Sequence, residues 1–89
     1  MLKPAYKTKF SKDLKRVTKR GYDIEKLKTV MVMLIDEKPL HKKYLDHPLK
    51  GDYSNCRECH IEPDWLLIYF IEKEIITFVR TGTHADLFH

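Results

Sequence analysis

The sequence predicts a single α+β domain, with a two-helix hairpin packed on one face of an antiparallel sheet, in the order β-α-α-β-β-β. Three observations predict it. The chain has 89 residues, too few for two cores, so residues 1–89 form one domain. Apolar residues recur at helical spacing in the first half and in strand-like runs in the second. A long stretch with two prolines and a glycine, residues 39–54, separates the halves.

The N-terminal half predicts a short strand at residues 4–9 and then a helix. From Phe10 onward, Phe10, Leu14 and Val17 share the i, i+4, i+7 spacing of one helix face. Gly21 has the residue type that commonly follows the last turn of a helix, so the first helix is expected to end there.

A second helix is expected to begin after Asp23, whose carboxylate can accept hydrogen bonds from the first free N–H groups. Glu25 is favourably placed in its first turn. The apolar stripe of this helix consists of Ile24, Leu27, Val30, Met31, Leu34 and Ile35.

The C-terminal half predicts a β-meander after a long irregular connection. We expect strands at 55–61, 65–71 and 75–80, a turn at 62–64, a break at 81–83, and a helical turn or docked tail at 84–88. The run from Trp65 to Ile71 is apolar on both faces, which is typical of a central strand. Because the helices cover one face, a functional site is expected on the opposite face.

Charge and composition narrow the possible partners and the compartment. Seventeen Lys and Arg against thirteen Asp and Glu give a net charge of +4, which suits a nucleic acid or an acidic protein. No apolar run follows the first lysines, and no stretch approaches the roughly 20 apolar residues of a membrane span. We therefore expect a cytoplasmic protein without membrane contact, in which Cys56 and Cys59 are reduced thiols.

The segment Cys56–His60 has the Cys-x-x-Cys-His spacing of c-type haem attachment. Haem attachment follows export, which the N-terminus does not predict. A zinc site would use Cys56, Cys59, His60 and His84, but adjacent Cys59 and His60 on a strand point to opposite faces. A thioredoxin-like redox pair would need a helix N-terminus in a βαβ context. The sequence therefore predicts no metal and no cofactor.

Several polar residues are expected to meet at one end of the sheet. They are His47, His60, Asp64, Arg80 and His84. Imidazoles, a carboxylate and a guanidinium are the groups needed for metal-free RNA cleavage. One group takes the proton from the ribose 2′-hydroxyl, another protonates the departing 5′-oxygen, and the cation stabilises the phosphorane.

Three aromatic residues are candidates for stacking on the bases of single-stranded RNA. They are Tyr53, Trp65 and Phe88, and Lys50 from the long loop is expected to contact the substrate beside them. Trp65 and Phe88 have the alternative interpretation of hydrophobic anchors for the hairpin and the tail.

Three blocks of the sequence closely resemble the YafQ family of bacterial type II toxins, within the RelE/ParE superfamily. They are DHPLKG (46–51), RECHIEPDWLLIY (57–69) and RTGTHADLF (80–88). The resemblance implies a ribosome-dependent endoribonuclease that cuts mRNA in the ribosomal A site. It also implies catalytic roles for His47, His60, Asp64, Arg80 and His84, with Trp65 and Phe88 beside them, and leaves the general acid and base unassigned.

Such toxins are made with an antitoxin, which is expected to be acidic, partly disordered and encoded nearby; operator DNA is bound only by the toxin–antitoxin complex. Two alternatives remain at this point. One is a ParE-like toxin that poisons gyrase and cuts no RNA, and the other is a non-catalytic module that acts as corepressor with its antitoxin.

Overall fold

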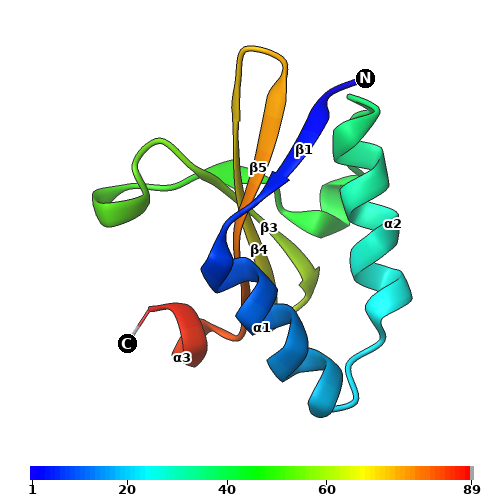
Figure 1. Cartoon of the computed structure of the whole chain (residues 1–89), viewed down its shortest axis with the longest axis vertical. Helices are drawn as coiled ribbons and strands as arrows, with labels where there is room; N and C mark the ends of the chain where they lie inside the picture. Colours follow the sequence, from blue (N-terminus) through cyan, green and yellow to red (C-terminus); the bar gives the residue numbers. More distant parts are fainter. Residues whose placement is uncertain (89) are drawn as a thin grey trace.

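A computed structural model describes residues 1–88 and confirms the α+β fold class, with a five-stranded sheet in the order β1-β5-β4-β3-β2. Figure 1 shows the sheet with the helices beside it. The strands are β1 (Lys3–Tyr6), β2 (His47–Pro48), β3 (Arg57–Glu62), β4 (Trp65–Glu72) and β5 (Ile75–Gly82). The helices are α1 (Thr8–Lys19), α2 (Ile24–Ile35) and α3 (His84–Leu87), with short 3-10 turns η1 (Lys42–Tyr44) and η2 (Gly51–Tyr53).

The two long helices form where the apolar spacing places them. Gly21 follows α1 with φ +84, a left-handed conformation that glycine adopts without a steric penalty. Asp23 caps α2 by accepting a hydrogen bond from the Glu25 N–H at 3.1 Å. The predicted first strand was too long, because β1 ends at Tyr6 and α1 begins at Thr8. The polar first turn of α1 precedes Phe10 and carries no apolar periodicity that could reveal it.

The sheet is antiparallel except at one edge. Strands β3, β4 and β5 form the expected antiparallel meander, but β1 pairs with β5 in parallel, with Ala5 opposite Thr77. A parallel pair needs a crossover connection, and the helices lie within that connection. Strand β5 also continues to Gly82, so the break predicted at Thr81 and Gly82 is wrong; both residues still pair with β4.

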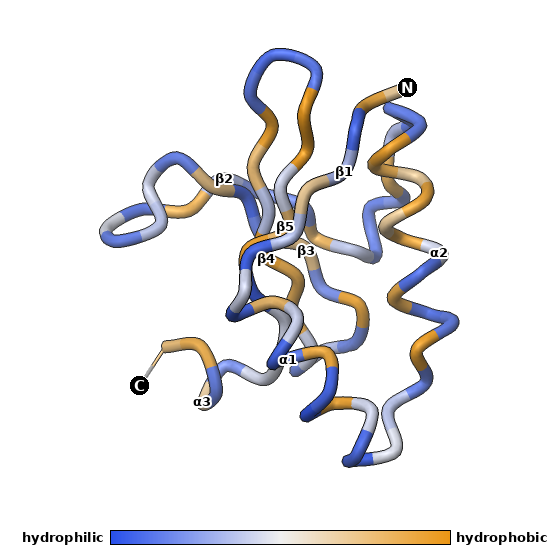
Figure 2. The backbone as a smooth tube through the Cα atoms, in the orientation of Figure 1, coloured by the Kyte–Doolittle hydropathy of each residue, from blue (hydrophilic) through white to orange (hydrophobic). Residues whose placement is uncertain are grey.

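The main core lies between the helices and one face of the sheet. Phe10 and Val17 of α1 and Leu27 and Val30 of α2 are at most 2% exposed, and they pack with alternate residues of β3, β4 and β5. Figure 2 shows much of β4 and β5 as apolar, while the β4–β5 turn is hydrophilic. A second, smaller cluster around Leu66, Ile68 and Leu87 lies on the other face.

The opposite face of the sheet is covered by α3 and by residues 49–56 of the connection that follows α2, whereas Leu40 and Tyr44 of this connection pack against the main core. This connection is less irregular than predicted, because it forms η1, β2 and η2. Pairing of β2 with β3 anchors it at the sheet edge, with His47 opposite Glu58. No helix among residues 1–88 is long and apolar enough to cross a membrane.

Candidate functional site

Strand alternation places the first histidine of the site on the face away from the helices. Cys59 and Ile61 of β3 belong to the main core. Glu58 and His60 alternate with them along the strand, so their side chains lie on the other face of the sheet, where they contact each other. A bulge after His60 shifts the register of β3 against β4 at the turn that follows. Bulges commonly re-aim side chains beside functional sites.

The second histidine reaches the same place through β2. Asp46 accepts hydrogen bonds from the Tyr69 hydroxyl at 2.6 Å and from Arg57 Nε at 3.2 Å, which ties the start of β2 to the sheet. His47 follows directly, and its Nδ1–H donates to the Leu45 carbonyl at 2.6 Å. The bonds of Asp46 and the contact with Leu45 therefore hold the His47 ring beside β3.

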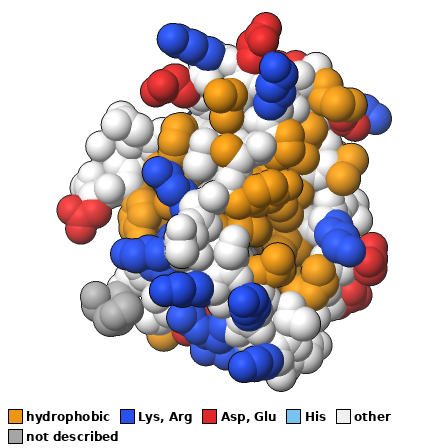
Figure 3. Space-filling view, in the orientation of Figure 1, with side chains coloured by type: hydrophobic (Ala, Val, Ile, Leu, Met, Phe, Trp, Pro, Cys, Tyr) orange, Lys and Arg blue, Asp and Glu red, His pale blue; other side chains and the backbone are white. Residues whose placement is uncertain are grey.

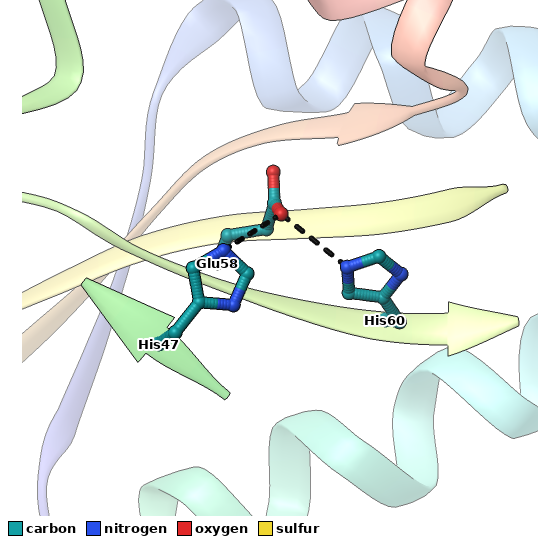
Figure 4. Close-up of side chains that lie close together, drawn as sticks. All are labelled: His47, Glu58 and His60. Atoms are coloured by element: carbon teal, nitrogen blue, oxygen red, sulfur yellow. Dashed lines mark ion pairs between the residues drawn. The ribbon is translucent and has the colours of Figure 1, made fainter. Parts of the chain in front are cut away.

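Glu58 joins these two histidines. One of its carboxylate oxygens, Oε2, lies 3.2 Å from His47 Nε2 and 3.4 Å from His60 Nε2 (Figure 4). The Glu58 side chain is only 6% exposed, so a buried carboxylate is compensated by two imidazoles. His60 Nδ1 also lies 3.3 Å from the Pro63 carbonyl in the β3–β4 turn. Glu58 was not predicted from the sequence, although it lies two residues before His60 on the same strand face.

Asp64 and His84 form a second pair, between the β3–β4 turn and the start of α3. Asp64 Oδ1 accepts a hydrogen bond from the His84 backbone N–H at 2.9 Å and lies 2.6 Å from His84 Nδ1. These bonds, the backbone one first, lower the pKa of Asp64. Because Asp64 is therefore ionised at neutral pH, His84 Nδ1 carries the proton of this contact, and Nε2 is left for other partners.

Helix α3 is fixed by a capping box and by α1. Thr83 Oγ1 accepts from the Asp86 N–H at 3.1 Å, and Asp86 Oδ2 accepts from the Thr83 N–H at 3.0 Å. Arg20 of α1 donates to both carboxylate oxygens of Asp86, at 2.7 and 3.1 Å. This ion pair lowers the pKa of Asp86. His84 therefore lies at the first position of a helical turn that is held on two sides.

The aromatic rings of the site form a continuous row. Ring centroids are 6.1 Å apart for His47 and His60, 5.8 Å for His60 and His84, and 6.4 Å for His84 and Phe88. Phe88 meets Tyr53 edge to face at 5.8 Å. Phe88 is 45% exposed, so it can offer a face to a ligand. The structure thus brings together the three predicted histidines, Asp64, Phe88 and Tyr53.

Arg80 lies beside this row and is oriented by a residue that the sequence analysis did not propose. Arg80 Nε and Nη2 donate to the two oxygens of Asp13 at 2.6 and 3.1 Å, and the Thr81 N–H donates to Asp13 at 3.2 Å. Asp13 is 1% exposed, and its hydrogen bonds raise the pKa of Arg80. Tyr53 also interacts with Arg80, which connects the guanidinium to the Phe88 end of the row.

Two predicted substrate contacts are placed differently. Trp65 is 1% exposed, packs against Tyr22 at 4.9 Å between ring centroids, and donates its indole N–H to Thr81 Oγ1 at 2.9 Å. Burial therefore assigns Trp65 to the core, because neither face of its ring is open to a base. Lys50 lies exposed just before η2, and no contact in the described chain ties it to the histidines.

The cysteines lie apart from this chemistry. Cys59 is fully buried in the helix-side core, and burial raises the pKa of its thiol to about 12. Burial also raises the pKa of Cys56. Since Cys59 and His60 occupy opposite faces, the four residues of the alternative zinc site do not converge.

Among residues 1–88, one group has donor atoms close enough to hold a metal ion: His47, Glu58 and His60 offer two nitrogens and an oxygen within 4.8 Å of one another. A divalent ion that prefers imidazole would find three ligands there. It would occupy His60, whose imidazole is a candidate for acid–base chemistry, together with His47.

Solved structures of bacterial toxins share this fold. The Escherichia coli DinJ–YafQ toxin–antitoxin complex contains a chain that is 45% identical, with a TM-score of 0.92 and coverage of 99% of this chain and 98% of that chain. A metal-bound toxin from Helicobacter pylori is 46% identical, with a TM-score of 0.92 and coverage of 99% and 100%. Fold and site together define a small bacterial toxin domain.

Sequence comparison identifies the family. A protein of Escherichia coli K12, described as mRNA interferase toxin YafQ, is 48% identical over 84 residues, which cover 93% of this chain and 91% of that protein. Residues 2–89 match the family described as bacterial toxin of type II toxin-antitoxin system, YafQ. The chain belongs to this family, as the three sequence blocks predicted.

Proposed function

We propose that this protein is the toxin of a type II toxin–antitoxin pair and acts as an endoribonuclease that cuts mRNA in the ribosomal A site. The observation that carries the proposal is the pairing of His84 with an ionised Asp64, 5.8 Å between ring centroids from a second imidazole that is held by a buried carboxylate. Two imidazoles at this separation can serve opposite ends of one phosphodiester. A protein with this activity would act in the cytoplasm, where translation occurs.

The reaction is a transesterification that needs no metal. The ribose 2′-oxygen bonds to the adjacent phosphorus, its proton passes to a general base, and the bond from phosphorus to the 5′-oxygen breaks. A general acid gives the leaving oxygen a proton, so the products are a 2′,3′-cyclic phosphate and a 5′-hydroxyl. Each proton transfer contributes about 10²- to 10⁴-fold in rate.

His84 is suited to one of the two proton transfers. Asp64 fixes the Nδ1–H tautomer, so the Nε2 atom can exchange a proton with substrate. His60, supported by Glu58 and His47, supplies the other transfer. Arg80 stabilises the charge on the phosphorane through Nη1, the nitrogen that Asp13 does not use.

An RNA with sulfur in place of the 5′-bridging oxygen separates acid from base. Because a thiolate leaves without protonation, a variant that lacks the general acid regains its rate on this substrate, and a variant that lacks the base does not. His84→Gln and His60→Gln are therefore compared on both RNAs with programmed ribosomes. The variant whose rate recovers on the sulfur-containing RNA is the one that lacks the general acid. If both variants lose activity and neither recovers, His84 and His60 do not act as acid and base.

An antitoxin of acidic character fits the helix side of the molecule. Figure 3 shows apolar side chains gathered between β1, α1 and α2, with Lys and Arg side chains around them. The half-buried or exposed apolar residues on these elements include Tyr6, Leu14, Ile24, Met31 and Ile35. An amphipathic acidic segment that folds on binding would cover this patch, and the complex rather than the free toxin would bind operator DNA.

The function is tested by expressing the chain without an antitoxin and mapping the 5′ ends of cellular mRNA. New ends in phase with codons are expected for the wild type and are absent for His84→Gln. Growth arrest with DNA damage and without new RNA ends would replace the proposal with gyrase poisoning. Operator binding without growth arrest would replace it with a corepressor role.

A further inference from the structure

A groove of about 590 Å³ opens beside His60, between α2 and the end of β3. It is lined by Lys26 and Thr29 of α2, Lys43, Tyr44 and Leu45 at η1, and Ile61, Glu62 and Pro63 at the β3–β4 turn. His60 contributes to the same wall, so the groove continues directly from the candidate catalytic residues. A volume of this size is in the range of small-molecule binding sites, which are mainly apolar with a few polar groups.

The floor of the groove suits a flat aromatic ligand. Ile61 and Pro63 supply aliphatic surface to its lining, and Tyr44, which packs against the core cluster of Ile61, supplies an aromatic ring. Leu45, which adopts the left-handed conformation at φ 50, is 58% exposed at the rim. Stacking of a base on an aromatic side chain contributes about 1–3 kcal/mol and does not depend strongly on which base it is.

The rim of the groove suits a phosphate backbone and one polar base edge. Lys43 Nζ lies over the Tyr44 ring, 5.2 Å from its centroid, so the groove carries a mobile cation that can turn from the ring toward a phosphate. Across the groove, Lys26 Nζ donates to Glu62 Oε1 at 3.0 Å. These three groups leave a net positive charge, and Glu62 is an acceptor for an amino group of a base.

We propose that this groove binds the base of a nucleotide next to the cleaved phosphodiester, and that Glu62 contributes to the choice of sequence. The inference rests on the proposed ribonuclease function and assigns a substrate subsite to it. Tyr44 supplies stacking that is common to all bases. Glu62 favours bases with an exocyclic amino group, which are adenine, cytosine and guanine, over uracil, which has none.

The test uses ribosomes programmed with mRNAs that differ only in the nucleotides flanking the cut. Tyr44→Ala is expected to raise KM by about 5- to 100-fold with kcat retained, because stacking on the ring is lost. Tyr44→Phe retains the ring and is expected to keep the wild-type KM. Glu62→Gln is expected to change the ratio of kcat/KM between substrates with and without an amino group at one flanking position. Lys28→Ala, an exposed change on α2 outside the groove, is the matched control.

The possible outcomes separate this proposal from the proposed function. If the wild type cuts mRNA and both Tyr44→Ala and Glu62→Gln keep its KM and its sequence preference, the groove is not a substrate subsite. Loss of antitoxin binding alone in these variants would reassign the groove to the antitoxin. If the wild type cuts no mRNA, NMR shifts on adding a short single-stranded RNA decide: shifts at Tyr44, Ile61 and Glu62 support base binding, and their absence overturns it.

Discussion

Asp64 and His84 form the most closely held pair of residues in the site. Both contacts of His84 converge on one oxygen of Asp64, so the carboxylate fixes the ring and its backbone together. The hydrogen bonds that lower the pKa of Asp64 keep it from acting as an acid near neutral pH. We therefore propose that Asp64 acts through His84, as a positioning residue.

Replacing Asp64 tests this role. Asp64→Asn keeps the size of the side chain but can present an N–H toward His84, which disturbs the tautomer. We expect the single-turnover cleavage rate on programmed ribosomes to fall by about 10²- to 10⁴-fold, with little change in thermal stability because the side chain is 64% exposed. Asp52→Asn, an exposed change in η2, is the control. A wild-type rate for Asp64→Asn would remove Asp64 from the mechanism.

The buried pair of Asp13 and Arg80 is a second residue-scale feature with a measurable consequence. Removing one partner leaves the other without compensation, so Asp13→Asn is expected to reduce the free energy of unfolding by about 3–5 kcal/mol. Arg80→Met in the same chain is expected to restore part of that loss. Urea denaturation of the two single variants and the double variant measures the coupling, and strictly additive effects would contradict it.

Residue chemistry was the part of the site that sequence reasoning predicted best. The histidines, Asp64 and Phe88 lie together as expected, whereas Glu58 and Asp13 were missed. Acidic residues are usually exposed, so neither attracted attention by type. The i, i+2 spacing of Glu58 and His60 on one strand was the available signal. For Trp65 the sequence left stacking and hydrophobic anchoring open, and its burial supports the anchor.

At the scale of elements, the β5–α3 junction controls where His84 lies. Gly82 has φ +154, and a Cβ atom added there would lie 2.8 Å from Asp86 Oδ2. Gly82→Ala is therefore expected to strain the backbone and displace the carboxylate of the capping box. We expect the free energy of unfolding to fall by about 1–3 kcal/mol. The cleavage rate should fall further than the fraction of folded protein does. Gly21→Ala, with open space around its Cβ position, is the matched control, and equal activity losses would contradict the assignment.

The ion pair between Arg20 and Asp86 makes the attachment of α3 to α1 depend on pH. Because the pKa of Asp86 is lower in the folded protein than in the unfolded chain, its stabilisation is present above about pH 4 and is lost as the pH falls further. Asp86→Asn removes this contribution. The wild type should therefore lose about 1–3 kcal/mol more than Asp86→Asn between pH 6 and pH 3, measured by denaturant titration. Parallel stability curves for the two proteins would show that the pair contributes nothing.

Elements were predicted where local signals are strong. The apolar stripe and cap of α2 and the apolar run of β4 gave their positions. The start of α1 and the end of β5 were missed, because polar residues continue the structure there through hydrogen bonds rather than through an apolar pattern. Strand β2 is only two residues long and depends on pairing with β3, a long-range contact that local sequence does not reveal.

For the whole molecule, the sheet separates two surfaces with different tasks. The site residues of β3 alternate with the core residues that face α1 and α2. The apolar patch with its basic surroundings lies on the helix side (Figure 3). The sequence predicted the face of the site from the order of the elements, because the helices were expected to cover the other face, but it did not predict the apolar patch. It did not predict the parallel pairing of β1 with β5, because the register of a distant strand depends on how the helical connection packs.

The apolar patch on the helix side is the surface that we expect the antitoxin to cover. Tyr6 is 54% exposed and stacks on Phe78 of the main core, so Tyr6→Glu places a negative charge within the apolar patch. We expect the affinity for an acidic antitoxin to fall by about 10- to 100-fold. The control is Ile75→Glu, a residue of similar exposure whose place next to Ile76 in β5 puts it on the other face. Calorimetry that found equal losses for both variants would remove the patch from the interface.

The central claim is that the Asp64–His84 pair cleaves mRNA on the ribosome. The most direct measurement is the rate of cleavage of a defined mRNA, with its A-site codon in place on purified ribosomes, by the wild type and by folded His84→Gln. We expect one cut in the A-site codon, a 2′,3′-cyclic phosphate at the new 3′ end, and a rate lower by about 10²- to 10⁴-fold in the variant. An intact mRNA with the wild type, or equal rates for the two proteins, would contradict it.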